Sequence, residues 1–275
     1  MTAEPTVGFW DTGEYITTSA KLQVGHPPGA PLYQMLGAIF SIFAFEKENI
    51  GFIMNLMSGF ASALAISFMY WSIILILKKI TDISEASINK QILISGSALV
   101  GSLAFAFTDT FWFSAVETEV YAMATLIMAV IFYLGLRWEA DMHNSRGNKW
   151  LLLICFVIGL SFGVHFMGLL VIPAIVMIYY FKNQKTILNS TKLNPIIGFF
   201  IANIFGLAIL MGVFKLLLPN TLKFFSAIEL LFVNNLGLPF NSGTLVAFIG
   251  IVYVFYFLIN YTRKKGMVRA NSITL

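Results

Sequence analysis

The sequence FIMNLMSGFASALAISFMYWSIILIL, residues 52–77, runs for 26 residues without a charged side chain. A helix that crosses a bilayer needs about 20 mostly apolar residues, with a range of about 17 to 25. This stretch therefore predicts a membrane-spanning helix. Four further segments meet the same requirement, namely residues 91–107, 120–138, 195–218 and 244–261.

The composition also indicates a membrane protein. Hydrophobic residues make up 58% of the 275 residues and charged residues only 11%, whereas soluble domains carry roughly 25% charged residues. These values exclude a soluble globular enzyme, a disordered chain and a coiled coil. The net charge of +4 is explained by the basic loops of a polytopic protein, so we expect membrane lipids and no nucleic acid as partners.

A sixth hydrophobic stretch, residues 150–181, is too long for one helix and carries His165 among three glycines. We interpret it as two short helices that meet near His165, which gives about seven crossings in total. An open sheet cannot satisfy its backbone in lipid, and no stretch is typical of a strand. The predicted fold is an all-α polytopic bundle.

The apolar run at residues 31–45 has only 15 residues, and the charge distribution decides its place. If it lies on the membrane surface as a juxtamembrane helix, 13 of the 17 basic residues gather on one side, in and beside loops 78–90, 139–149 and 182–194 and the tail after residue 261. The positive-inside rule makes that side cytoplasmic. Nine of the 13 acidic residues then face outward. Inserting the run would place only the first loop inside, beside Lys21, so the surface position is favoured.

We expect one transmembrane domain over residues 1–275. Residues 1–51 form its first extracytoplasmic loop, residues 52–261 its bundle and residues 262–275 a cytoplasmic tail. Residues 1–30 belong outside, although no signal peptide or span precedes residue 52. The expected explanation is a piece of a longer protein without its N-terminal helix.

Ionisable residues near membrane depth are candidates for functional sites. Asp11 and Glu14 lie in FWDTGEY, residues 9–15, at a spacing that puts both carboxylates on one face of a helix. The flanking aromatic residues can desolvate a carboxylate and raise its pKa toward values that suit a general base. The alternative is ordinary charge at a helix N-terminus beside an interfacial aromatic belt.

The next candidates, Lys21 and His26, lie in KLQVGHPPG, residues 21–29. Pro27 and Pro28 fix the backbone, so His26 would be held in place. A fixed His or Lys beside the amides of a helix N-terminus suits a phosphate group. The alternative is a turn that anchors the surface helix and binds no ligand.

A third group, Glu117, Glu119 and Tyr121, stands at the outer start of a crossing. Residues two apart diverge on a helix. We therefore expect Glu119, with Tyr121 close by, to face the site, while Glu117 faces solvent. Ordinary charge at a helix N-terminus is the alternative here as well.

Three weaker candidates follow. His165 is explained equally well by a packed, hydrogen-bonded histidine and by a ligand contact. Asn234 and Asn241 lie in a predicted loop, residues 232–243, whose amides suit hydroxyl-rich ligands but also plain turns. No zinc, nucleotide-binding or hydrolase motif occurs, so we assign no metal site and no certain cofactor.

The same segments resemble a known family. The runs EPTVGFWDTGEY, residues 4–15, and KLQVGHPPGAPL, residues 21–32, resemble the protein O-mannosyltransferase-like membrane family, which is common in bacteria and belongs to the GT-C glycosyltransferases. The segment from Phe111-Trp112 to ETEVY at residues 117–121 is similar to the same family, as is the loop at residues 233–243. The similarity extends over nearly the whole chain.

This resemblance implies a GT-C-like bundle in a bacterial inner membrane. It implies a glycosyltransferase that moves a mannose-like sugar from a polyprenyl-phosphate donor to a hydroxyl acceptor, a Ser or Thr of a protein, on the extracytoplasmic face. Asp11, with Glu14 nearby, would then serve catalysis, and the turn at His26 would lie near the phosphate of the donor. Members are usually longer and carry a soluble C-terminal region beyond residue 275.

The residues and the resemblance together give one main hypothesis. Asp11 takes the proton of the acceptor, and His26, with Lys21 or His165, steadies the departing phosphate. Glu14 and Glu119 orient the sugar or the acceptor, or hold a divalent cation if one is used. The other candidates for substrate binding are Glu117, Tyr121, Asn234 and Asn241. A transporter or flippase of lipid-linked sugars and a non-catalytic scaffold remain alternatives, although no internal repeat favours a transporter.

Overall fold

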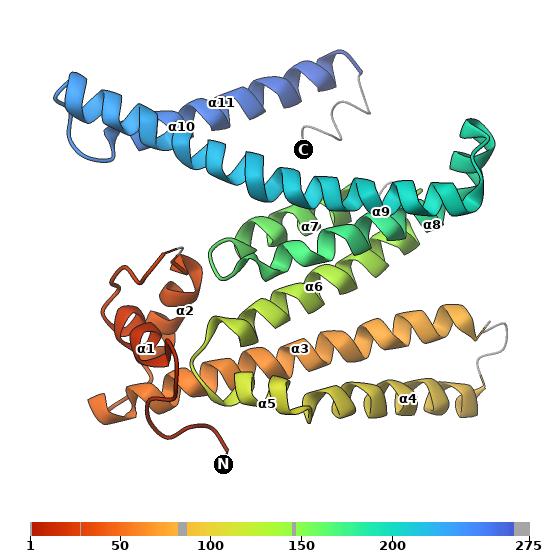
Figure 1. Cartoon of the computed structure of the whole chain (residues 1–275), viewed down its shortest axis with the longest axis horizontal. Coiled ribbons are helices and arrows are strands. Elements are labelled where there is room, and N and C mark those ends of the chain that lie inside the picture. The colour runs from red at the N-terminus through yellow and green to blue at the C-terminus, as the bar shows by residue number, and fades with distance from the viewer. Residues whose placement is uncertain (1, 28, 82–86, 145–146, 267–275) are drawn as a thin grey trace. The chain divides into compact units, whose positions relative to one another are not determined.

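The computed structural model describes residues 2–27, 29–81, 87–144 and 147–266, and no strand occurs among them. Figure 1 shows the order of the helices along the chain. The chain begins with α1 Thr12–Ala20, α2 Pro31–Ser41, η1 Lys47–Asn49, α3 Ile50–Ile80, α4 Ile88–Ala106, α5 Asp109–Val116, α6 Val120–Asp141, α7 Gly147–Ser161, η2 Phe166–Val171 and α8 Ile172–Thr191. After these come α9 Pro195–Gly212, η3 Val213–Leu217, α10 Leu218–Leu230, η4 Leu231–Asn235 and α11 Ser242–Lys264.

Five helical segments are long and apolar enough to cross a membrane, which confirms an all-helical, multi-pass membrane protein. They are Lys47–Ile80, Val120–Asp141, Phe166–Thr191, Pro195–Asn235 and Ser242–Lys264. The pair α4 and α5 meets the same criterion jointly, with a bend of 70° between the two helices. The described residues thus hold up to six spans. The seventh expected crossing falls on α7, which is apolar but has 15 residues, and it stays a prediction.

Two further expectations agree with the structure, namely the break near His165 and the short helix that begins at residue 31. The stretch at residues 150–181 is broken, because α7 ends at Ser161 and η2 begins at Phe166, with His165 between them. The run at residues 31–45 forms α2, which has 11 residues and ends at Ser41. A helix of that length cannot span a bilayer.

The span predicted for residues 195–218 ends too early. The chain stays helical from Pro195 to Asn235. Pro219 suggested an end because proline lacks the N–H that a helix interior needs. In the structure a π-helical turn, Val213–Leu217, directly precedes the helix that carries Pro219. The wider turn accommodates the missing donor, so the helix continues.

The chain divides into two compact units, Met1–Asn203 and Ile204–Leu275. Whether both serve one functional domain stays a prediction. In the second unit, Glu229 of α10 joins the start of α11: its Oε1 accepts from the backbone N–H of Asn241 at 2.6 Å, and its Oε2 accepts from that of Thr244 at 2.8 Å. The carboxylate therefore caps α11 from the neighbouring helix.

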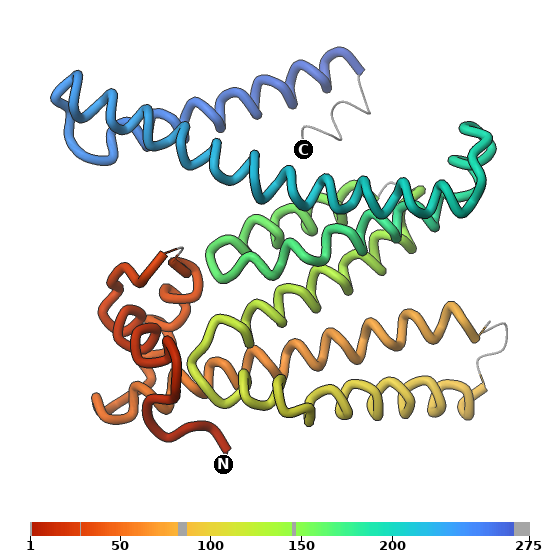
Figure 2. The backbone as a smooth tube through the Cα atoms, in the orientation of Figure 1, coloured from red at the N-terminus to blue at the C-terminus, as the bar shows by residue number. Residues whose placement is uncertain are grey.

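Helix α3 forms the centre of the first unit, where it packs against α6, α4 and α5. Figure 2 shows α1 and α2 grouped near the starts of α3 and α6. The core there contains Tyr33, Met54 and Ala124, each at most 1% exposed. This packing fixes the first loop against the bundle.

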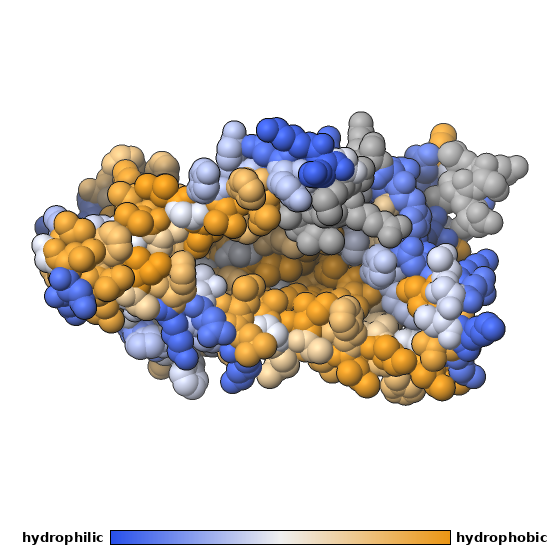
Figure 3. Space-filling model, turned by 90° about the horizontal axis from the view of Figure 1, so that it is seen from above, coloured by the Kyte–Doolittle hydropathy of each residue, from blue (hydrophilic) through white to orange (hydrophobic). Residues whose placement is uncertain are grey.

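The C-terminal ends of α3 and α6 meet the middle of α8 in an ionic cluster. Glu139 of α6 pairs with Lys79 of α3, and with Lys182 of α8 at 3.4 Å. The C-terminal ends of α3 and α6 therefore lie beside each other and beside Lys182 of α8. Large hydrophobic side chains stay exposed along the helices, among them Phe248, Tyr253 and Phe255 of α11. Figure 3 shows hydrophobic residues over much of one face, as expected for a surface in contact with lipid.

The turn between α7 and η2 holds the start of α2. The carbonyl oxygen of Gly163 accepts from the backbone N–H of Leu32 at 2.8 Å and from that of Tyr33 at 3.1 Å. These donors belong to the first turn of α2, which has no partners within its own helix. A Cβ at position 163 would lie 2.7 Å from the Cβ of Leu32. Glycine is therefore required for this contact.

Gly163→Ala should displace α2 and lower the free energy of unfolding by about 1–3 kcal/mol, the usual cost of overpacking. Thermal unfolding of the detergent-solubilised protein measures the effect. Gly159→Ala is the matched control, because a Cβ at that position of α7 meets no atom within 4 Å, and alanine is the better helix former. Equal melting temperatures for the two variants would contradict the role of Gly163.

Candidate functional site

Asp11, Glu14 and His26 come together at the start of α1. Asp11 occupies the N-cap position, and its side chain makes no capping hydrogen bond. Glu14 lies in the first helical turn, so the two carboxylates share one side of the helix as the spacing predicts. Oε1 of Glu14 accepts from the backbone N–H of His26 at 2.6 Å, and its Oε2 lies 3.0 Å from Nδ1 of that ring. Oδ2 of Asp11 lies 3.8 Å from Nε2.

His26 and Glu14 shift each other's titration. The backbone hydrogen bond from His26, followed by its side chain, lowers the pKa of Glu14. The hydrogen bond to the Glu14 carboxylate raises the pKa of His26, and the charges of Glu14, Asp11 and Glu119 add to the rise. Between these two pKa values the imidazolium and the carboxylate form an ion pair. The stabilisation is lost as pH falls through the lowered pKa of Glu14, and also as pH rises through the raised pKa of His26.

Glu14→Gln should therefore bring the pKa of His26 back down toward the ordinary range. An NMR titration of the His26 ring in micelles measures this pKa. Glu48→Gln is the matched control, since Glu48 is exposed and lies in the short turn η1. An unchanged pKa in Glu14→Gln would show that the pair does not form in solution.

Glu117 and Glu119 lie in an extended link between α5 and α6, with φ of −120° and −135°. The expectation that Glu117 faces solvent is wrong, because its side chain is 5% exposed and that of Glu119 is 7% exposed. That expectation assumed a helix, where residues two apart diverge. In extended backbone, residues i and i+2 point to the same side, so both carboxylates are buried. The carboxyl of Glu117 lies beneath Gly8, where an added Cβ would come within 2.8 Å of it.

One buried amide of α3 holds this link and the N-terminal segment together. Nδ2 of Asn55 donates to the carbonyl oxygens of Glu4 and Thr6 at 2.7 and 2.9 Å. Its Oδ1 accepts from the hydroxyl of Thr118 at 2.5 Å. Asn55 and Thr118 are both 0% exposed. Asn55 therefore fixes the segments that directly precede Asp11 and Glu119 in the chain.

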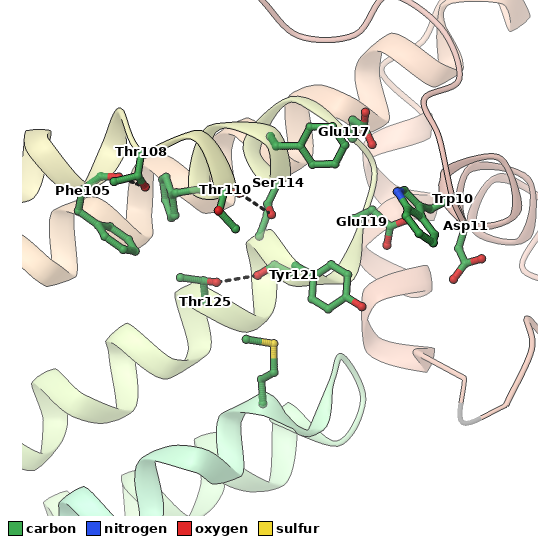
Figure 4. Close-up of a pocket in the computed structure, with 14 residues that line it drawn as sticks. Trp10, Asp11, Phe105, Thr108, Thr110, Ser114, Glu117, Glu119, Tyr121 and Thr125 are labelled. Atoms are coloured by element: carbon green, nitrogen blue, oxygen red, sulfur yellow. Dashed lines mark hydrogen bonds between the residues drawn. The ribbon is translucent and has the colours of Figure 1, made fainter.

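A cavity of about 560 Å³ opens beside these carboxylates. Figure 4 shows Trp10, Asp11 and Glu119 grouped at one end of it, with Tyr121 nearby. The lining residues are Trp10, Asp11, Phe105, Thr108, Thr110, Phe111, Phe113, Ser114, Glu117, Glu119, Tyr121, Ala122, Thr125 and Met167. Asp11 both lines the cavity and faces His26, so it stands between the two.

Glu119 has the chemistry of a buried acid. Burial raises the pKa of its carboxyl to about 7, the Asp11 carboxylate adds to the rise, and main-chain hydrogen bonds from Asp11 and Val120 oppose it. Its Oε1 is buried and has no hydrogen-bond partner among the described residues. Burial, and then the charge of Glu119, also raises the pKa of Tyr15 to about 12. The Glu119 carboxyl can therefore accept or donate a proton near neutral pH.

His165 lies beside Tyr121, with ring centroids 5.4 Å apart. Its Nδ1 accepts from the backbone N–H of Met167 at 3.2 Å, which leaves the ring proton of the neutral form on Nε2. The residue thus caps η2 and also contacts a residue that lines the cavity. Both explanations offered by the sequence fit this position.

Three candidate residues remain, namely Lys21, Asn234 and Asn241. Lys21 is exposed at the end of α1 and, within the described part of the chain, its side chain makes no hydrogen bond or ion pair. Asn234 is helical, in η4, so its expected place in a loop is wrong. Asn241 does precede a helix, as the N-cap of α11 with a φ of 70°. Both asparagines belong to the second unit, and their role in binding stays a prediction.

Sequence reasoning gave no role to Asn55, and it treated Trp10 only as one of the aromatic residues that flank Asp11. Trp10 has a φ of 56° and an exposed fraction of 87%, a strained and costly conformation for a bulky residue. Asn55 is the lone amide in the apolar stretch at residues 52–77. A polar side chain inside a span is a recognisable signal, and it could have identified Asn55.

The cluster also has the ligands of a cation site. Asp11, Glu14 and His26 each offer one ligand atom, and these atoms lie within 4.8 Å of one another. Carboxylate oxygen and imidazole nitrogen bind several divalent metals. The assignment of no metal stays a prediction.

With this geometry described, the chain can be compared with known proteins. The family model described as protein O-mannosyl-transferase TMEM260 N-terminal domain matches residues 11–188, which include Asp11, His26, Glu119 and His165. The chain belongs to this family. The resemblance seen in the sequence is thus confirmed.

Two curated proteins of the TMEM260 family are similar to this chain at low sequence identity. The chain is 24% identical over 209 residues to the protein O-mannosyl-transferase tmem260 of Dictyostelium discoideum, covering 72% of this chain and 24% of that protein. It is 27% identical over 154 residues to the protein O-mannosyl-transferase TMEM260 of Mus musculus, covering 55% and 19%. The chain spans about a quarter or less of these relatives. No solved structure matches it significantly.

Proposed function

We propose that this chain forms the membrane part of a glycosyltransferase that moves a mannose-like sugar from a polyprenyl-phosphate donor to a Ser or Thr hydroxyl of a protein. The observation that carries the proposal is the position of Asp11, between His26 on one side and a cavity on the other. A proton acceptor between a phosphate-binding group and an acceptor space suits a direct displacement at a sugar carbon. Membership of the TMEM260 family and the names of the relatives support the same activity.

The proposed reaction is a single displacement. The acceptor oxygen attacks the anomeric carbon, and the bond from that carbon to the phosphate oxygen breaks with its electron pair. The acceptor proton passes to the carboxylate of Asp11. Protonated His26 faces the departing phosphate, whose negative charge grows in the transition state, and an opposite charge placed there stabilises it.

The other candidate residues have supporting roles in this proposal. Glu14 keeps His26 protonated and oriented through its two contacts with that residue. Glu117, Glu119 and Tyr121 line the acceptor space, and His165 supports Tyr121. Lys21 contacts donor or acceptor groups outside that space. A binding role for Asn234 and Asn241, which belong to the second unit, stays a prediction.

We place the reaction on the extracytoplasmic face of a bacterial inner membrane. Glu139, Lys79 and Lys182 mark one end of the first unit, and the positive-inside rule assigns an end rich in basic residues to the cytoplasm. The acid-rich first loop lies by the starts of α3 and α6. That end then faces outward, where a polyprenyl-phosphate sugar is available and a nucleotide sugar is not.

The test is transfer of labelled mannose by sealed vesicles that hold the full-length protein. The expected result is labelled Ser or Thr from externally presented polyprenyl-phosphate mannose and none from a nucleotide sugar. Vesicles without the protein provide the background. Transfer from the nucleotide sugar alone would overturn the donor assignment, and binding of the lipid-linked sugar without transfer would indicate a carrier.

A further inference from the structure

The cavity beside Asp11 has an unusual charge balance. Three of its lining residues are acidic, Asp11, Glu117 and Glu119, and none of the 14 is Lys, Arg or His. A phosphate group inside it would face carboxylates and no balancing cation. The proposed donor phosphate therefore belongs on the His26 side, and the cavity is left for the acceptor.

Glu119 points to the kind of group that this cavity takes. Glu119 is 93% buried, since its exposed fraction is 7%. Its Oε1 has no hydrogen-bond partner in the described part of the chain. A buried oxygen without a donor costs free energy that a ligand donor can recover. Burial raises the pKa of this carboxyl. A cation at the same place would favour the ionised carboxylate and so lower the pKa.

The aromatic lining favours an organic cation over a metal ion. Trp10 is 87% exposed and Tyr121 is 47% exposed, and both line the cavity in the neighbourhood of Glu119. The backbone of Trp10 has a positive φ, which is strained for a bulky residue, and its ring packs against few other side chains. Rings beside carboxylates bind ammonium and guanidinium groups through cation–π contacts and charged hydrogen bonds.

We propose that this cavity selects acceptor segments in which a lysine or arginine stands next to the modified Ser or Thr. The basic side chain enters between Trp10 and Tyr121 and donates to the free oxygen of Glu119, and this places the neighbouring hydroxyl at Asp11. The inference rests on the proposed function and names the acceptor class of the same site.

The experiment compares three threonine peptides that differ only in the residues beside the threonine, which are Lys, Gln or Glu. Peptide binding and sugar transfer are both measured with the full-length protein in nanodiscs. We expect kcat/KM to be about tenfold higher for the Lys peptide than for the Gln peptide, and lowest for the Glu peptide. In Glu119→Gln, the ratio of kcat/KM for the Lys peptide to kcat/KM for the Gln peptide should fall to about twofold or less, whatever the absolute rate.

Two further variants are measured, one as a second test of the cavity and one as a matched control. Tyr121→Leu should also reduce the ratio, and it covers the case in which Glu119→Gln fails to fold. Glu48→Gln makes the same chemical change at an exposed acid, and it should keep the wild-type ratio.

The outcomes separate this inference from the proposed function. Equal transfer to all three peptides would overturn the selection of basic acceptors and leave the transferase intact. Tighter binding of the Lys peptide without transfer to any peptide would support the cavity and count against the transferase. A preference that disappears with a chelator would show that a metal ion occupies the cavity, which overturns the inference.

Discussion

Asp11→Asn is expected to lower the rate of sugar transfer by about 10²- to 10⁴-fold, the usual contribution of a positioned general base. The change removes the proton acceptor but keeps the size of the side chain. Stability should not change, because Asn is as good at an N-cap position as Asp and the Asp11 side chain makes no capping bond. Transfer from a polyprenyl-phosphate sugar is measured at matched expression, together with the melting temperature.

Asp109→Asn is the matched control for this variant. Asp109 is exposed in the first turn of α5, and it does not line the cavity. It should keep wild-type transfer. Full activity of Asp11→Asn would remove Asp11 from the chemistry and leave Glu119 as the carboxylate to test next.

Asn55→Leu should be the most damaging single substitution for the structure of the site. It removes two donated bonds and one accepted bond at a position that is 0% exposed. The hydroxyl of Thr118 and two backbone carbonyls would lose their partner, at a cost of about 1–3 kcal/mol for each group left buried without one. The melting temperature should fall, and the N-terminal segment should become accessible to protease.

Asn89→Leu controls for the added hydrophobic side chain, because Asn89 is exposed in the first turn of α4. Its melting temperature should remain that of the wild type. If Asn55→Leu unfolds at the same temperature as Asn89→Leu, the buried amide does not hold the first loop.

Much of the fold follows from the lengths of apolar segments. The run at residues 52–77 became α3, and the broken stretch around His165 became α7 and η2. Lipid leaves a chain few ways to satisfy its backbone, so composition and length carry most of the information. The continuation of the helical segment past Pro219 could not be predicted in this way, because the π-helical turn before Pro219 depends on local backbone adjustment.

The site was predictable where it depended on local spacing. Asp11 and Glu14 share a side of α1 because three residues make nearly one helical turn. The contact of Glu14 with His26, 12 residues further on, depends on a turn whose path the sequence does not specify. The burial of Glu117 depends on an extended link held by Asn55, a residue far away in the chain. Such long-range contacts carry no periodic signal.

The bond between Gly163 and the first turn of α2 has a consequence for sequence variation. A Cβ at position 163 and the Cβ of Leu32 would compete for the same space, so the two positions constrain each other during evolution. Every residue except glycine has a Cβ, so a larger residue at position 163 requires glycine at position 32 or a shift of the loop that carries His26. Relatives that keep this loop and a side chain at position 32 should therefore also keep glycine at position 163.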